Sequence, residues 1–293
     1  MVPLPNALFK YVSPERVDVI KTLQIRFTQP SQFNDPFDVL PCIDWRVDGK
    51  QIDQAADQVE RRRFRSYALR LEREGRTPVA FEDFKDIQAR HNRRRIEELR
   101  DPARFKEIAT AWNQRWWDRV GILSLSAAEK SLLMWAHYTG SHEGMLVEFD
   151  PKHPFFSPPG KTPGVDFGTT VEVVYSKARP RVGFGDAAGD AAATLLTLNT
   201  KSEDWAYEKE WRVFQLLEKS DAKVVGAAET VHLFNLPPTS MKRVVVGCRM
   251  DAARRAELIR ALRTNSNLSH VQVCEARLDT DCFGLTYTPL PFH

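Results

Sequence analysis

Residues Gly121-Ile122-Leu123-Ser124-Leu125-Ser126 alternate apolar side chains with small polar ones. This alternation is typical of a β-strand that has one face on a hydrophobic core. Similar patterns predict further strands at residues 8–12, 24–28, 144–150, 170–175, 242–247, 271–276 and 285–288, and one after a polar turn within residues 205–217. Helical spacing of apolar residues predicts helices at 131–138 and 251–263. We therefore expect an α+β fold with a mixed, mainly antiparallel sheet core.

Residues 51 to about 119 differ in composition from the flanking sequence, because Arg, Glu and Gln dominate and apolar residues recur at helical spacing. Between residues 61 and 120 there are 17 Lys or Arg and 10 Asp or Glu, a local net charge of +7. We expect a helical insertion that interrupts a single α+β domain spanning residues 1–293. Its basic runs, 61–65 and 93–95, either bind a nucleic acid or an acidic protein, or form a solvated helix face with ion pairs.

The composition of the whole chain excludes several classes of protein. Its 293 residues include 42 Lys or Arg and 39 Asp or Glu, a net charge of +3, and 42% of them are hydrophobic. These values exclude a disordered chain, a collagen-like repeat and a disulfide scaffold. No apolar run approaches the roughly 20 residues that a membrane helix needs, and the N-terminal residues do not resemble a signal peptide. Because the four cysteines form no C-x-x-C pair, we expect reduced thiols and no metal site. Because the chain shows neither an export signal nor a membrane helix, we expect a cytoplasmic protein that does not contact a membrane.

The segment from Trp205 to Arg212 holds the most informative candidate site residues. On a strand, Glu208, Glu210 and Arg212 would point to the same face, because side chains alternate. Two neighbouring carboxylates repel each other unless one is neutralised, and Arg212 can do this through a bidentate ion pair. The second carboxylate then remains available for a polar ligand or for catalysis. The alternative is a structural ion pair on an edge strand.

Other polar positions are weaker candidates. Ser124 and Ser126 share one face of their expected strand, where hydroxyl groups orient a carboxylate or hold a ribose. His137 is either a polar residue within the core or a ligand-binding residue, and Asn34, in a loop at 30–38, either shapes a turn or lines a pocket. The chain has no P-loop, no G-x-G-x-x-G and no G-x-S-x-G motif, which argues against P-loop ATP hydrolysis, a Rossmann dehydrogenase and a serine hydrolase.

Several motifs outside the insertion carry a resemblance to a known family. They are Leu8-Phe9-Lys10-Tyr11, Arg26-Phe27, Phe33-Asn34-Asp35-Pro36-Phe37, Leu123-Ser124-Leu125-Ser126, Leu133-Met134-Trp135-Ala136-His137-Tyr138 with His142 and Gly144, and Lys201 followed by Trp205–Arg212. With these motifs the chain resembles DUF2971, a bacterial family of proteins of unknown function. The resemblance covers nearly the whole chain outside the insertion, and it implies no activity.

A more distant resemblance is to ADP-ribosyltransferases. That superfamily places a basic or aromatic residue on an early strand, a serine or tyrosine on a middle strand and a glutamate on a late one. The matching residues of this chain are, in the same order, Lys10 or Tyr11 with Arg26 as a further candidate, Ser124 or Ser126, and Glu208-x-Glu210. The resemblance implies an enzyme of a bacterial toxin, defence or stress system that uses NAD as its substrate and modifies a protein or nucleic-acid acceptor.

The chemistry that this resemblance implies can be written as a hypothesis. Breaking the nicotinamide–ribose bond of NAD builds positive charge on the ribose. We expect Glu210 to stabilise this charge by binding the ribose 2′-hydroxyl, Glu208 to steer or deprotonate the acceptor, and Ser126 to orient Glu210. Tyr11 or another aromatic residue of the pocket would stack on the nicotinamide ring. The other expected substrate-binding residues are Lys10, Arg26, Asn34, Ser124, His137 and Arg212.

Two alternatives stay open. The first is a nucleic-acid-binding protein or Mg²⁺-dependent nuclease in phage defence, which would use the basic insertion together with Asp35, Glu208 and Glu210. The second is a non-enzymatic regulatory module whose insertion binds a protein. NAD consumption without metal favours the transferase, whereas Mg²⁺-dependent cleavage of plasmid DNA or RNA favours the nuclease.

Overall fold

The computed structural model describes residues 3–39, 42–44, 49–88, 101, 104, 107, 118–163, 166–183, 196, 198–226 and 229–291. The chain divides into two compact units. Unit 1 comprises Met1–Val39, Trp117–Ala178 and Asn199–His293, and unit 2 comprises Leu40–Trp116 and Arg179–Leu198. Among the described helices, none combines the length and apolar character that crossing a bilayer requires.

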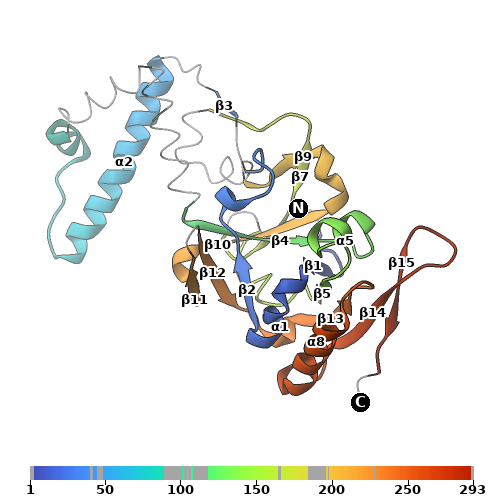
Figure 1. Cartoon of the computed structure of the whole chain (residues 1–293). Helices are drawn as coiled ribbons and strands as arrows, with labels where there is room; N and C mark the ends of the chain where they lie inside the picture. Colours follow the sequence, from blue (N-terminus) through green and yellow to red (C-terminus); the bar gives the residue numbers. More distant parts are fainter. Residues whose placement is uncertain are drawn as a thin grey trace. The chain divides into compact units, whose positions relative to one another are not determined.

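Unit 1 is built on an eight-stranded sheet with the order β15-β14-β13-β5-β1-β4-β10-β6 (Figure 1). Its strands are β1 (Leu8–Val12), β4 (Val120–Ser126), β5 (Met145–Phe149), β6 (Thr170–Glu172), β10 (Glu210–Leu216), β13 (Met241–Val246), β14 (Gln272–Leu278) and β15 (Leu285–Pro289). Neighbouring strands are antiparallel except β13 and β14, which are parallel. Together with the helices of unit 1, this sheet confirms the predicted α+β fold with a mixed, mainly antiparallel core.

Smaller elements complete unit 1. A three-stranded sheet has the order β11-β12-β2, and β7 pairs with β9 in parallel. The bounds are β2 (Gln24–Phe27), β7 (Val174–Ser176), β9 (Thr200–Ser202), β11 (Ala222–Val225), β12 (Thr230–Asn235), α1 (Asp18–Thr22), α5 (Leu132–Tyr138) and α8 (Ala252–Thr264). The predicted strand at 170–175 is therefore divided between β6 and β7, which pair with different partners.

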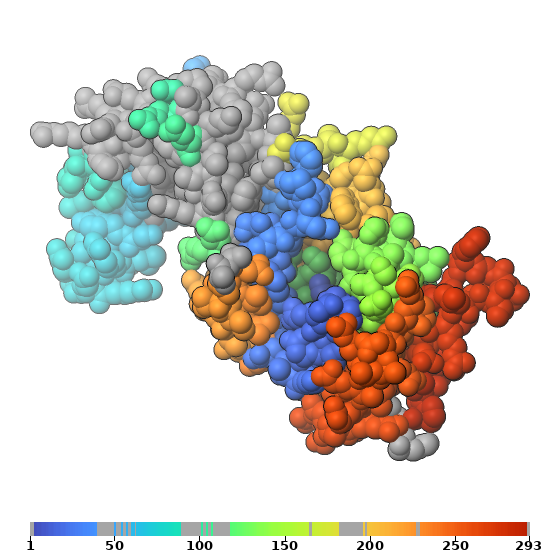
Figure 2. All heavy atoms as spheres, viewed as in Figure 1, coloured from blue at the N-terminus to red at the C-terminus, as the bar shows by residue number. Residues whose placement is uncertain are grey.

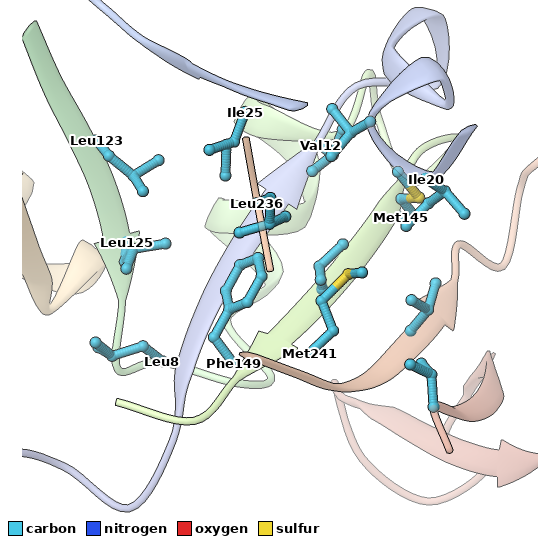
Figure 3. Close-up of a cluster of buried hydrophobic side chains, with 14 of the residues drawn as sticks. Leu8, Val12, Ile20, Ile25, Leu123, Leu125, Met145, Phe149, Leu236 and Met241 are labelled. Carbon is cyan, nitrogen blue, oxygen red and sulfur yellow. The ribbon is translucent and has the colours of Figure 1, made fainter. Parts of the chain in front are cut away.

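The two faces of the large sheet bury different helices. On one face, Leu8 and Val12 of β1 pack with residues of α1 and α8, and Figure 3 shows this cluster around Phe149 and Met241. On the other face, Phe9 and Tyr11 of β1 pack with Met134 and Trp135 of α5. Full burial of one such side chain contributes about 1.5–3 kcal/mol. The alternating pattern of β1 therefore anchors α5 to the second face, where the candidate site lies.

The sheet is incompletely paired between β1 and β4. The two strands pair at Phe9 and Ser126 alone among the described residues, whereas β1 pairs with β5 along its whole length. At the other end of β4, Ile122 pairs instead with Thr28, next to β2. Backbone groups beyond a ladder need other partners. Here Lys10 supplies one, because its Nζ atom donates a hydrogen bond of 2.8 Å to the carbonyl oxygen of Ser124.

Unit 2 contains α2 (Gly49–Arg73), a helical segment at residues 81–88, and the parallel pair β3 (Cys42–Asp44) and β8 (Arg181–Gly183). The rings of Phe64, Phe81 and Phe84 pack together, and Arg61 lies over Phe81. Arg61, in the first basic run, also pairs with Asp57. The second basic run, 93–95, lies outside the described residues. The helical segment at 81–88 and all but the first two residues of α2 lie in the expected insertion. The bounds of the insertion and its binding partners stay predictions.

Candidate active site

A polar cavity of about 260 Å³ opens on unit 1 beside the gap between β1 and β4. A recess is visible in Figure 2 between the blue N-terminal segment and the light-green segment that contains α5. The cavity is lined by Phe9, Lys10, Tyr11, Thr28, Gln32, Phe33, Asn34, Asp38, Ser124, Leu125, Ser126, Met134, Tyr138, Lys201, Glu208 and Glu210. Small-molecule sites are usually concave and have few polar groups that converge on the ligand. This cavity is more highly charged than such sites usually are, because five of its lining residues carry ionisable acidic or basic side chains: Lys10, Asp38, Lys201, Glu208 and Glu210.

Glu208 and Glu210 reach this cavity from two different elements. Ser202 begins a 3-10 helix at Glu203–Glu208 by accepting a hydrogen bond from the backbone of Asp204. Lys209 ends this helix in the left-handed conformation, with φ +44°, and β10 then begins at Glu210. The prediction that Glu208, Glu210 and Arg212 share one face of a strand is therefore wrong for Glu208. The backbone reversal at Lys209 nevertheless brings both carboxylates to the same cavity.

Glu210 and Arg212 form a fully buried ion pair. Arg212 Nε donates to Glu210 Oε1 at 2.8 Å, and Arg212 Nη2 donates to Glu210 Oε2 at 2.9 Å. Arg212 Nη2 also donates to both carboxylate oxygens of Asp38, at 2.9 and 2.8 Å. Burial by itself would raise the pKa of Glu210, but Arg212 and Lys201 outweigh it and hold that pKa well below its usual range. Glu210 is therefore an ionised, firmly held carboxylate.

Lys201 lies at the centre of the charged cluster. Its Nζ atom is 2.6 Å from Glu208 Oε2, 3.1 Å from Glu210 Oε2 and 3.5 Å from Asp38 Oδ2. Burial opposes the charge, yet these three carboxylates raise the pKa of Lys201 above its ordinary value. The ammonium group thus neutralises part of the negative charge of the three carboxylates. In the part of the chain that the structure describes, no group of His, Cys, Asp and Glu is suited to hold a metal ion.

Glu208 is held by fewer donors than Glu210. Its Oε1 atom accepts a hydrogen bond of 2.5 Å from the Tyr138 hydroxyl, and its Oε2 atom accepts one from Lys201. Burial raises the pKa of Glu208, and Lys201 offsets only part of this rise. A carboxylate offers about four acceptor positions. Glu208 therefore keeps acceptor capacity for a ligand in the cavity.

The two serines differ in what they bind. Ser126 Oγ donates to the backbone carbonyl of Glu208 at 2.5 Å and accepts from the backbone of Ala128 at 2.9 Å. The expectation that Ser126 orients the Glu210 carboxylate is replaced, because the Ser126 hydroxyl binds the backbone of Glu208 and Ala128, and it is the Ser124 side chain that acts to lower the pKa of Glu210. The strand register explains this: Glu210 is opposite Ser126, but its side chain leans along the strand toward Arg212, which is opposite Ser124.

Two predicted residues of β1 line the cavity, where both already have protein partners. Burial lowers the pKa of Lys10 to about 8, although Glu210 and Glu208 act in the opposite direction. The Tyr11 hydroxyl donates to the carbonyl oxygens of Ala128 and Glu129, and its ring packs edge-on against Trp135 at 5.6 Å. These contacts fix Tyr11 as part of the wall.

The remaining predicted residues separate into two groups. Asn34 lines the cavity. Arg26 and His137 are outside its lining: Arg26 pairs with Glu229 at 3.0 Å, and the exposed His137 ring lies 6.2 Å from that of Tyr207. Asp35, expected to join a nuclease site, is also outside the lining, and its carboxylate accepts the backbone N–H of Phe37.

Sequence reasoning gave no role to Asp38, Lys201 or Tyr138. Lys201 and Tyr138 were part of the motifs, but their contacts with Glu208 join positions that are 7 and 70 residues apart. Asp38 meets Arg212 across 174 residues. Two neighbouring glutamates carry more negative charge than one arginine can neutralise. The sequence could therefore have indicated that a further cation lies near them, but not which residue supplies it.

Comparison with known proteins supports the family resemblance over part of the chain. The model of a family described as "Protein of unknown function (DUF2971)" matches residues 134–213. No curated protein and no solved structure matches the chain. The matched segment carries Tyr138, Lys201, Glu208, Glu210 and Arg212, so most of the charged cluster falls within it.

Proposed function

We propose that this protein cleaves the nicotinamide–ribose bond of NAD and transfers the ADP-ribosyl group to an acceptor, as part of a bacterial toxin, defence or stress system. One observation supports this most strongly. Lys10 from an early strand, Ser124 from a middle strand and Glu208 and Glu210 from a late segment line one cavity, in the chain order that ADP-ribosyltransferases use.

The free acceptor capacity of Glu208 favours it as the reacting carboxylate. Glu210 accepts from Arg212 twice and from Lys201 once, so three of its about four acceptor positions are filled. Glu208 accepts from Tyr138 and Lys201 and keeps about two positions open. We therefore assign to Glu208 the contact with the substrate that the sequence had suggested for Glu210.

The reaction would proceed through a cationic ribose. The C1′–N bond breaks with its electron pair going to the pyridinium nitrogen, so neutral nicotinamide leaves and positive charge develops on the ribose. The ionised Glu208 stabilises that charge. A lone pair of the acceptor then forms the new bond to C1′, and the acceptor proton passes to Glu208. Arg212 holds Glu210, Glu210 holds Lys201, and Lys201 in turn fixes Glu208.

The test is the release of nicotinamide from NAD by the purified full chain, measured by chromatography in the presence of EDTA. We expect release without added metal, and transfer of labelled ADP-ribose when a bacterial lysate supplies an acceptor. Saturation-transfer NMR should show NAD in contact with the protein. Absence of both NAD binding and nicotinamide release would refute the proposal. Cleavage of plasmid DNA or RNA that requires Mg²⁺ would support the nuclease alternative.

A further inference from the structure

Tyr138 makes a short, directed contact with Glu208. Its hydroxyl donates to Glu208 Oε1 at 2.5 Å, and both side chains line the cavity. Hydrogen bonds to an ionised acceptor are shorter and stronger than those between neutral groups. Tyr138 is therefore placed to act on the carboxylate that we assign to the reaction.

Two elements bear on the position of the Tyr138 hydroxyl. Tyr138 ends α5, whose start is capped by Ser131 and whose Trp135 is completely buried. Asn34, in the loop that follows β2, lines the same cavity as Tyr138, and its side chain acts to lower the pKa of Tyr138. Burial and the charge of Glu208 raise the pKa of Tyr138 well above its usual value, so the phenol keeps its proton. The hydroxyl proton is thus available to Glu208.

We propose that Tyr138 is a positioning residue that keeps Glu208 ionised and aimed into the cavity, and that Asn34 fixes the direction of the Tyr138 hydroxyl. This inference rests on the proposed function, because it takes Glu208 to be the reacting carboxylate. It goes further by dividing the site into a donor side, Asn34 and Tyr138, and an electrostatic side, Lys201 with Glu210 and Arg212. The donor side acts on Oε1 and the electrostatic side on Oε2.

Several charged and titratable groups also act on Glu208. They are Lys201 from β9, Glu210 from β10, Lys10 from β1, Tyr175 from β7 and Tyr207 from the 3-10 helix, while Arg212 and Asp38 act on Glu210 and Lys201 in the same cluster. Of these, Lys201 and Glu210 act on its pKa most strongly after burial. None of them is altered when the Tyr138 hydroxyl alone is removed. A change in the titration of Glu208 in Tyr138→Phe therefore reports the hydroxyl contact.

The experiment compares Tyr138→Phe with Tyr207→Phe in the full chain. Tyr207 is next to Glu208 in sequence, but its ring packs on Trp205 and its hydroxyl is not the donor to Glu208. In Tyr138→Phe, loss of a donor to a charged group should raise the pKa of Glu208 by about one to two units. The acid limb of the pH profile for nicotinamide release should move up by the same amount, so that the rate at low pH falls about tenfold or more. Tyr207→Phe keeps the hydroxyl donor to Glu208 and should move the acid limb by much less than Tyr138→Phe does.

A second readout does not require activity. The carboxyl carbon of Glu208, labelled with ¹³C and assigned by its loss in Glu208→Gln, can be titrated by NMR in the parent and in each variant. Asn34→Ala keeps the Tyr138 hydroxyl and should give a smaller shift in the same direction. An unchanged Glu208 titration in folded Tyr138→Phe, or in Asn34→Ala if the first variant does not fold, would overturn the inference. If the parent releases no nicotinamide but the titration shifts as expected, the proposed function fails while the role of Tyr138 in setting the charge of Glu208 stands.

Discussion

Replacing Lys201 with Met should destabilise unit 1 strongly, because Lys201 is a nearly fully buried cation among three carboxylates. Its Nζ atom lies 2.6, 3.1 and 3.5 Å from Glu208, Glu210 and Asp38, and its side chain is 5% exposed. Removing one partner of a buried ion pair costs about 3–5 kcal/mol, since the other charge stays buried. A domain of ordinary stability, about 5–15 kcal/mol, would lose about a fifth or more of its free energy of unfolding.

The loss should depend on pH. Burial already raises the pKa of Glu208 and of Asp38, and without Lys201 both values rise further. A carboxyl whose pKa is higher in the folded than in the unfolded chain takes up protons on folding, so its contribution to stability falls as pH rises. Lys201→Met should therefore lose least free energy of unfolding near pH 5 and most near pH 8, measured by urea unfolding with tryptophan fluorescence.

Lys177→Met removes an exposed pair with Glu203 and is the matched control, expected to cost at most about 1 kcal/mol. A loss below about 1 kcal/mol in Lys201→Met at every pH would refute the reasoning.

Three further substitutions test other parts of the structure. The pKa of Lys10 falls from 10.5 to about 8 on folding, so the unfolded chain binds the extra proton between these values and parent stability should rise with pH there; Lys10→Met should abolish that rise. A stability that rises equally with pH in the parent and in Lys10→Met, measured by urea unfolding, would contradict this. Ser126→Ala removes the donor to the Glu208 carbonyl and should lower the free energy of unfolding by about 1–3 kcal/mol, measured by thermal or urea unfolding. An unchanged free energy of unfolding would show that this contact is dispensable. Gly144→Ala would place a Cβ atom 2.0 Å from the backbone oxygen of Val12, so we expect the free energy of unfolding to fall by about 3 kcal/mol or more. A circular-dichroism melting curve equal to that of the parent would show that the backbone moves to accommodate the Cβ atom.

Much of the sheet could be predicted because its strands carry local signals. Residues 8–12, which are apolar and buried on both faces apart from Lys10, coincide with β1, and the expected helix at 131–138 is α5 with its Ser131 cap. β11 was missed, because Ala222–Val225 is a short, mostly exposed edge strand without alternation. Local sequence patterns thus predicted those strands and helices in which the apolar residues are also the buried ones.

The candidate site could be predicted only in part. The sequence indicated Glu208, Glu210 and Arg212, because two carboxylates near an arginine are recognisable without coordinates. It could not show that the backbone turns at Lys209. A left-handed position is usually recognised in a sequence by glycine or asparagine, and here the residue is lysine. Nor could it show that Lys201 and Asp38 complete the cluster, because their contacts depend on how β9, β10 and the loop after β2 come together.

The most direct test of the central claim compares Glu208→Gln with Glu210→Gln in nicotinamide release and in urea unfolding. Glu208 has open acceptor positions and Glu210 balances buried Arg212, so the two variants should fail in different ways. Glu208→Gln should lose about 100- to 1,000-fold in rate with nearly parental stability, whereas Glu210→Gln should lose about 3–5 kcal/mol of stability. Full activity in Glu208→Gln, with the parent active in the same assay, would contradict the account.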